Sequence, residues 1–415
     1  LKSIMIETTE TIHIKDNNFN KIPKLELINI KGKQVFFGSN CFIECFPQHN
    51  YLPIQRKQSD EKIIRIEGTN NISIANACFK KLGLLEQIEL KSNQIIVGDD
   101  CFDECKYLSS FILSESKEFL LGSNQFRKCS NFQGIKLNSA KIQFGTRCFS
   151  QSNITNVEIL CEKIIIDKFS FSDLSTITEF SINKSSSVII EEKAFLGCNN
   201  LKSFSVISEL SVYINNSSFI NLNSLQKIYI KCPAIFIGES CFMNCKSLSS
   251  IEFDKVHEYI ISDTAFSHCE SLKKLSLNSN QKAQIKRYSF FDCKNLSSIE
   301  FGGEEILLDE SCFENCSSLS LSTFSNVNVL DIKSKCFQNC VNLAKIYIGK
   351  SGVVHFGSFC FFKALKLTSI DIYTDHLITD ENCFYQCESL KSLIFDKVKN
   401  AVFIPNSFRE CSNLQ

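Results

Sequence analysis

Residues 235–253 read IFIGESCFMNCKSLSSIEF, and the pattern of this stretch recurs along the whole chain. Aligned on Phe242, equivalent phenylalanines return every 22 to 24 residues, with one longer step of 37 residues. A fixed period in this range is typical of a solenoid, in which each repeat forms one coil. The seventeen anchor phenylalanines are Phe19, Phe42, Phe79, Phe102, Phe126, Phe149, Phe171, Phe195, Phe219, Phe242, Phe266, Phe290, Phe313, Phe337, Phe361, Phe384 and Phe408.

Alternating apolar pairs flank each anchor. In this stretch they are Ile235 and Ile237 before Phe242, and Ile251 and Phe253 after it. Alternation at period two is typical of β-strands with one buried face. We therefore predict two short strands in each coil, with a short helical or 3₁₀ turn around the anchor. One coil cannot bury its apolar side alone, so successive coils must stack through parallel sheets.

One continuous solenoid of about 17 coils is expected to span residues 1–415. The long step between Phe42 and Phe79 holds an insertion at about 46–60, which reads as a loop because it contains Pro47 and Pro53. Apolar residues at both ends match only part of the repeat, so we predict incomplete repeats there and expect the array to be part of a longer one.

Composition argues against two classes of partner. Lys plus Arg and Asp plus Glu number 45 each, so the chain lacks the basic excess with which proteins neutralise nucleic-acid phosphates. No apolar run approaches the roughly 20 residues that cross a bilayer. We expect no nucleic-acid partner, and membrane attachment only through segments outside this chain.

The 22 cysteines fall mostly into two columns of the repeat. Eleven lie three residues after the anchor and nine directly before it. Other coils carry Leu82, Ala364 or Ser289 at these positions, which suits a small buried filler better than a metal ligand. Disulfides between coils are the other alternative, but stacked residues point their Cβ atoms in parallel. We predict buried free thiols and no metal site.

Catalytic motifs are not visible. The sequence contains neither a phosphate-binding G-x-x-x-x-G-K-[ST] loop nor a G-x-G-x-x-G motif, and its six histidines share no spacing. We therefore expect no enzyme activity and no cofactor.

Outward strand positions are the candidate protein-binding residues. Tyr229, Tyr347 and Tyr373 lie on the first strand, and tyrosine is enriched at interface hot spots, although it also simply suits strands. Outward positions of the second strand are apolar in eleven of seventeen coils, which suggests a covered flank and self-association, unless these side chains cover one another. The representative residues are Ile189, Phe236 and Ile260.

The unit I-x-I-G-x-x-C-F-x-x-C-x-x-L-x-x-I-x-I resembles the Treponema pallidum-type leucine-rich repeat of BspA-like surface proteins, in a protist-like version. Family repeats commonly carry Pro after the second Ile, and here they almost never do. The resemblance implies a right-handed leucine-rich-repeat solenoid, displayed on a cell surface or secreted, that binds host, matrix or other cell-surface proteins. An intracellular, cytoplasmic scaffold is the alternative, because free thiols are typical of reducing compartments.

Overall fold

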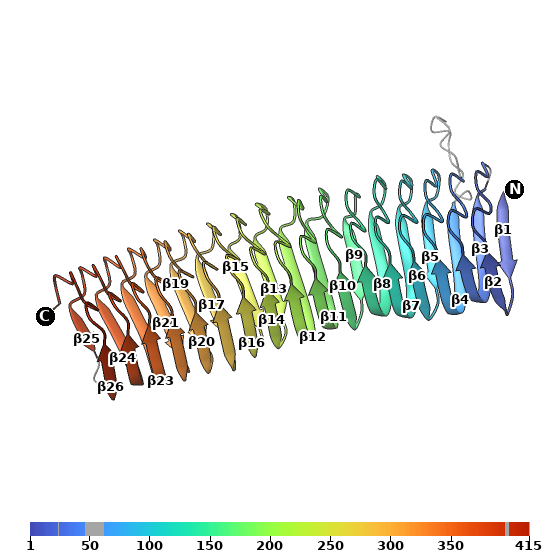
Figure 1. The fold of residues 1–415 in the computed structure, drawn as a ribbon. Coiled ribbons are helices and arrows are strands. Elements are labelled where there is room, and N and C mark those ends of the chain that lie inside the picture. Colours follow the sequence, from blue (N-terminus) through green and yellow to red (C-terminus); the bar gives the residue numbers. More distant parts are fainter. Residues whose placement is uncertain (24, 46–61, 395–397, 415) are drawn as a thin grey trace. The chain divides into compact units, whose positions relative to one another are not determined.

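The computed structural model describes residues 1–23, 25–45, 62–394 and 398–414, and all its regular elements are strands (Figure 1). The chain divides into two compact units, Leu1–Asn200 and Leu201–Gln415, and each unit is a parallel-strand solenoid. The predicted insertion at 46–60 lies outside the described residues. The continuity of all coils over residues 1–415 stays a prediction.

The first unit contains β1 (Ser3–Glu7), β2 (Thr11–Ile14), β3 (Leu27–Phe37), β4 (Ile63–Ile74), β5 (Gln87–Lys91), β6 (Gln94–Val97), β7 (Ser110–Leu121), β8 (Gly134–Phe144), β9 (Asn156–Leu160), β10 (Lys163–Ile166) and β11 (Glu179–Ile190). The second unit contains β12 (Ser203–Ile214), β13 (Lys227–Lys231), β14 (Ala234–Ile237), β15 (Ser250–Asp254), β16 (Glu258–Ile261), β17 (Lys274–Asn278), β18 (Lys282–Ile285), β19 (Ser298–Gly302), β20 (Glu305–Leu308), β21 (Leu321–Ser325), β22 (Val329–Ile332), β23 (Lys345–Phe356), β24 (Ser369–Thr379), β25 (Ser392–Ile394) and β26 (Asn400–Phe403).

Equivalent residues of successive coils lie opposite one another, as the register of the parallel strands shows. In the first unit Glu89 of β5 pairs with Ile112 of β7, and in the second Tyr229 of β13 pairs with Glu252 of β15. Side chains alternate along a strand, so the predicted apolar positions all face the interior. The two predicted strands per coil and the stacked-coil solenoid are thus confirmed.

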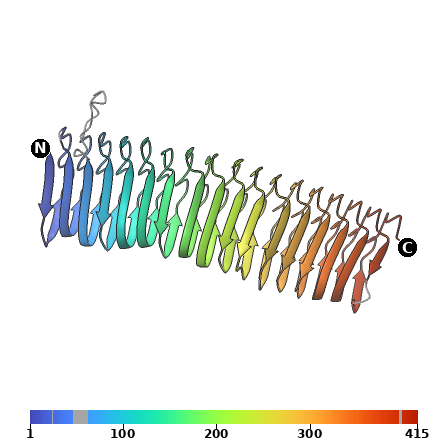
Figure 2. The same cartoon turned by 180° about the vertical axis from the view of Figure 1, so that it is seen from behind.

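In eight coils the two strands are joined into one long strand of 11 or 12 residues that bends in the middle. Several of these pairs carry a register shift at the bend, for example between Gly32 and Gln34 or between Ile348 and Ser351. Figure 2 shows from behind that the strands of neighbouring coils run side by side in the same direction. In other coils, such as that of β13 and β14, a short connection separates the two strands.

The anchor phenylalanines stack ring upon ring inside each unit. In the first unit the eight rings from Phe19 to Phe195 lie 4.8 to 5.8 Å apart between centroids, with interplanar angles of 5° to 22°. In the second the nine rings from Phe219 to Phe408 lie 5.0 to 5.5 Å apart. Stacked rings gain free energy beyond the burial of their area. The phenylalanine ladder is thus the centre of each core.

The segment around each anchor is the one part of the fold that differs from expectation. We predicted a helical or 3₁₀ turn, but the described residues form successive non-helical turns. The residues two before and two after each anchor have positive φ, such as Asn40 and Glu44 around Phe42, and a right-handed helix cannot pass through them. The anchor amides donate to the following coil instead, as Phe42 N does to Cys78 O at 2.8 Å and Phe290 N to Cys312 O at 2.8 Å.

No helix that could span a membrane occurs among the residues that the structure describes.

Replacing Phe290 with alanine should lower the free energy of unfolding of the second unit by about 3–5 kcal/mol, because the ring is fully buried between Phe266 and Phe313. The same change at Phe408 should cost less, since that ring is half-buried and stacks on Phe384. Urea denaturation of both variants measures the difference. Equal losses at the two positions would contradict stabilisation by nearest-neighbour stacking.

Candidate binding surfaces

The outward face of the first strands brings two of the three predicted tyrosines together. Tyr347 of β23 pairs with Asp371 of β24, and Tyr373 lies two residues further along β24 on the same face. Both tyrosines are exposed, at 42% and 38%. Neighbouring coils carry different residues at these positions, for example Thr323 opposite Tyr347. Tyr347 and Tyr373 therefore form a local aromatic patch on a variable, solvated face.

Tyr229 lies apart from this patch. It is on β13, which pairs with β12 and β15 rather than with β23 or β24. Its hydroxyl donates to Asp254 Oδ2 at 3.3 Å, and Lys231 Nζ lies 2.8 Å from the same oxygen. Tyr229 is thus half-buried in a polar network of its own.

The outward column of the second strands consists of short apolar stretches. In the second unit Phe236 pairs with Tyr213 on one side and with Ile260 on the other, and both neighbours are exposed. In the first unit Ile189 pairs with Ile165. Polar residues interrupt the column at Ser73, Gln143, Gln284, Asp331 and His355. The predicted apolar residues are therefore placed on an outward face, but as separate patches.

Two polar hollows lie at the bend between the strands, where the repeat pattern predicted nothing. In the first unit a hollow of about 280 Å³ is lined by Gly32, Gly68 and Ser92 and bordered by Glu67 and Lys91. A hollow of about 480 Å³ occupies the equivalent bend of the second unit. It is lined by Gly302 and Gly303 between Glu300 and Glu304. Glycines directly after the first strand are the sequence feature that could have located both hollows.

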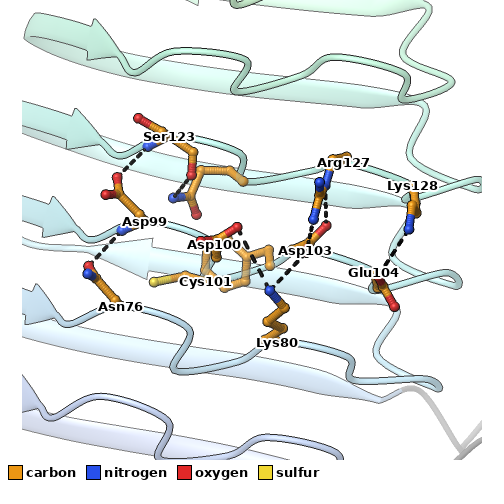
Figure 3. Close-up of polar contacts among 12 residues, drawn as sticks. Asn76, Lys80, Asp99, Asp100, Cys101, Asp103, Glu104, Ser123, Arg127 and Lys128 are labelled. Atoms are coloured by element: carbon orange, nitrogen blue, oxygen red, sulfur yellow. Dashed lines mark hydrogen bonds and ion pairs between the residues drawn. The ribbon is translucent and has the colours of Figure 1, made fainter.

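The most buried charge of the first unit lies on the turn side (Figure 3). The Asp103 side chain is 0% exposed and accepts two bonds from Arg127, at 3.1 Å from Nε and 2.9 Å from a terminal nitrogen. Lys80 Nζ lies 3.1 Å away on the other side. Burial alone would raise the pKa of Asp103, but the bonds from Arg127 and Lys80 outweigh it and lower the pKa. Two cations hold this carboxylate ionised, which makes it a poor proton acceptor. The charge-assisted hydrogen bonds of the cluster instead join three successive coils.

Asparagine and aspartate oxygens make a second set of bonds between coils in the same view (Figure 3). Asn76 Oδ1 accepts a bond from the Asp99 backbone amide at 2.8 Å, and Asp99 Oδ1 accepts one from the Ser123 amide at 2.7 Å. These side chains accept hydrogen bonds from backbone amides at the start of the turn, where the strand has ended. These polar residues of the turn thus serve mainly to join successive coils.

The cysteines have a structural role that the sequence did not reveal. All are free thiols, and all but the half-buried Cys411 are buried. Each of the eleven thiols three residues after an anchor donates to the carbonyl of the preceding anchor phenylalanine, at 2.8 to 3.4 Å. Burial raises the pKa of Cys105 and Cys245 to about 12, so these thiols stay protonated and able to donate. The predicted burial is confirmed, and the thiol is a donor as well as a filler.

The cysteine position directly before the anchor follows a different rule. There Cys101 Sγ donates to Gly98 O at 3.3 Å, and in another coil Ser170 Oγ donates to Asp167 O at 2.7 Å. Each also reaches a carbonyl of the preceding coil, Cys101 Sγ that of Ala75 at 3.1 Å and Ser170 Oγ that of Gly145 at 2.8 Å. In these two coils serine and cysteine therefore make equivalent pairs of hydrogen bonds.

Ser152 shows why the position after the anchor prefers cysteine. It occupies the thiol position of its coil, and its buried hydroxyl has no hydrogen-bond partner. The C–O bond is shorter than the C–S bond, so the hydroxyl stops short of the carbonyl that a thiol reaches.

Replacing Ser152 with cysteine should therefore stabilise the first unit by about 1 kcal/mol, because the new thiol can donate to the Phe126 carbonyl. Ser152→Ala is the matched control, since it removes the unpaired hydroxyl without supplying a donor. The urea midpoint of each variant measures the effect. If both variants have the same midpoint, the thiol bond contributes nothing to stability.

No group of three or more histidine, cysteine, aspartate or glutamate side chains with the geometry of a metal site occurs in the described ranges.

The repeats of this chain are similar to those of known proteins. A family model for the BspA type leucine rich repeat region, in six copies, matches residues 57–178, 164–293, 235–352 and 283–415. A leucine-rich repeat protein from Bacteroides ovatus is similar in structure, with 19% identity and a TM-score of 0.46 over 89% of this chain and 91% of that one. A search of curated proteins returned no match.

Two further solved structures are similar at lower scores. The leucine rich repeat protein of T. pallidum has 19% identity and a TM-score of 0.32, and the match covers 46% of this chain and 83% of that one. A leucine rich cell surface protein from Faecalibacterium prausnitzii has 16% identity and a TM-score of 0.26, with 69% and 87% covered.

Proposed function

Because this chain belongs to the BspA-type leucine-rich repeat family, we propose that it is a non-enzymatic protein whose outward strand faces bind other proteins. The observation that supports the proposal is that the inward and outward positions of each coil have different roles. Inward positions repeat from coil to coil and are spent on packing, whereas outward positions vary and present exposed side chains such as Tyr347 and Tyr373. A variable face on a rigid ladder is suited to recognising a protein surface.

The finer proposal is that the protein is displayed on a cell surface or secreted, where it contacts host, matrix or other cell-surface proteins. The resemblance of the repeat to BspA-like surface proteins supports this location. An intracellular scaffold is the second candidate, and the free thiols favour it because reducing compartments keep cysteines unpaired. Labelling of intact cells with a membrane-impermeant biotin reagent distinguishes the two, since only a displayed protein is labelled.

Replacing both Tyr347 and Tyr373 with alanine should weaken binding to a recognised matrix or cell-surface protein by at least about tenfold, because exposed tyrosines dominate many interfaces. The measurement is biosensor binding of the purified chain to a panel of purified matrix and cell-surface proteins. Tyr107→Ala is the matched control, since Tyr107 is equally exposed, at 43%, but lies outside the strands. Absence of binding across the panel, or equal losses in both variants, would contradict the proposal.

We further propose that the apolar patches of the second strands mediate self-association. Replacing Ile189, Phe236 and Ile260 with serine should convert an associated species into a monomer in light scattering, because burial of these side chains drives the contact. Leu321→Ser is the control, because Leu321 is an exposed apolar residue at the start of a first strand. An unchanged mass in the triple variant rejects self-association through this column.

A further inference from the structure

His355 occupies an unusual place in the outward column of the second strands. It lies on β23, where its Nδ1 is 2.9 Å from Asp331 Oδ1 on β22. Its Nε2 is 3.2 Å from Asp380 Oδ1, directly after β24. One imidazole ring therefore bridges the coil before it and the coil after it.

The two contacts define the protonation state of the ring. An ionised carboxylate only accepts hydrogen bonds, so each ring nitrogen must carry a hydrogen to bond its partner. Neutral histidine has one N–H and one lone pair, and the lone pair would face a carboxylate oxygen. Both bonds form together only in the imidazolium, which carries two N–H groups and a positive charge.

The surrounding charges favour this state. Lys333 Nζ lies 2.8 Å from Asp331 Oδ2, so both oxygens of Asp331 face a cation. Burial would raise the pKa of Asp331, but the bonds from His355 and Lys333 outweigh it and lower the pKa. The bond to Asp331 is the main cause of the raised pKa of His355; burial opposes it and the bond to Asp380 adds to it. The other titratable side chains on the adjacent strand β24 are Asp371, Tyr373, Asp375 and His376.

We propose that His355 is a proton-dependent clasp, which ties β22, β23 and the end of β24 together when it is protonated and releases one carboxylate when it loses the proton. The clasp is built from side chains on three successive coils, so its state changes how tightly those coils hold one another. It requires no ligand and is independent of what the outward faces bind.

The sign of the pH dependence follows from the direction of the shift. A histidine whose pKa is raised in the folded state contributes stability that is fully present below the unfolded pKa of about 6.5. That contribution is lost as the pH rises through the raised value. The clasp is therefore closed in acidic surroundings and open in alkaline ones.

Two other histidines of the second unit provide internal comparisons. His268 Nδ1 lies 3.1 Å from Asp292 Oδ2, a contact that neutral histidine can also make with a single N–H. His376 Nδ1 lies 3.5 Å from the side-chain amide of Asn400, which can donate to a neutral ring. Neither arrangement requires the imidazolium, so the double carboxylate contact sets His355 apart from both.

Amide hydrogen exchange of residues 345–356, corrected for the intrinsic effect of pH, tests the clasp in the full chain. In the wild type, protection of β23 should fall between about pH 5.5 and about pH 8, by about tenfold for each unit by which folding raises the pKa of His355. His355→Gln should lack this fall, whereas the control His376→Gln should retain it. The same fall in the wild type and His355→Gln would overturn the proposal.

Asp380→Asn gives a second variant that keeps the contact but removes its charge. An amide can donate to a neutral ring as well as accept from a charged one, so β23 should stay more protected than in the wild type at about pH 8. Its protection should depend less on pH, because only Asp331 then favours the charged ring. The imidazole NMR signals of the wild type should show His355 titrating above the ordinary histidine value of about 6.5. Titration of His355 at or below about pH 6.5 would overturn the clasp.

Discussion

The stacking of each anchor phenylalanine on the next is the contact on which the rest of the structure depends. It holds the coils at the spacing that parallel strands require, so that one repeat period satisfies both the aromatic ladder and the sheet hydrogen bonds. Once that spacing is set, every side chain faces its equivalent in the neighbouring coil. The thiol donors, the Asp103 clamp and the His355 contacts are all consequences of this alignment.

The columns of the repeat allowed the strands, the buried phenylalanines and the inward pairs to be predicted, because periodicity in sequence translates directly into position in a solenoid. The turn was not predictable in the same way. Residues such as Asn40, Arg147 and Phe359 all adopt positive φ at one column, so no single residue type marks it. Tertiary hydrogen bonds to the next coil impose this conformation, and local preference does not reveal it.

The candidate surfaces were likewise predictable only in part. Tyr347 and Tyr373 could be assigned to an outward face from the pattern, and their adjacency follows from the register. The role of the cysteines was read as filling space, since Leu82 and Ala364 occupy the same column. Their donation to carbonyl oxygens depends on the length of the C–S bond and on the position of the preceding coil. Amino-acid composition reveals neither of these. Asp331 and His355 occupy the same column of the repeat, so an alignment of the repeats would have suggested their contact. Asp380 lies two positions away from that column, and only the structure reveals its contact with His355.

The backbone hydrogen bonds of the turns run in both directions along each unit. Strand amides and carbonyls point alternately to both neighbours, so their dipoles largely cancel. Anchor amides donate towards the following coil, as Phe42 N does to Cys78 O and Phe337 N to Cys360 O, whereas amides at the start of the turn donate towards the preceding coil, as Gly38 N does to Ile14 O. The peptide dipoles of these two sets of amides therefore oppose one another. Each turn is consequently anchored to the coil on either side of it, and loss of one neighbouring coil would leave backbone groups of the turn without a partner.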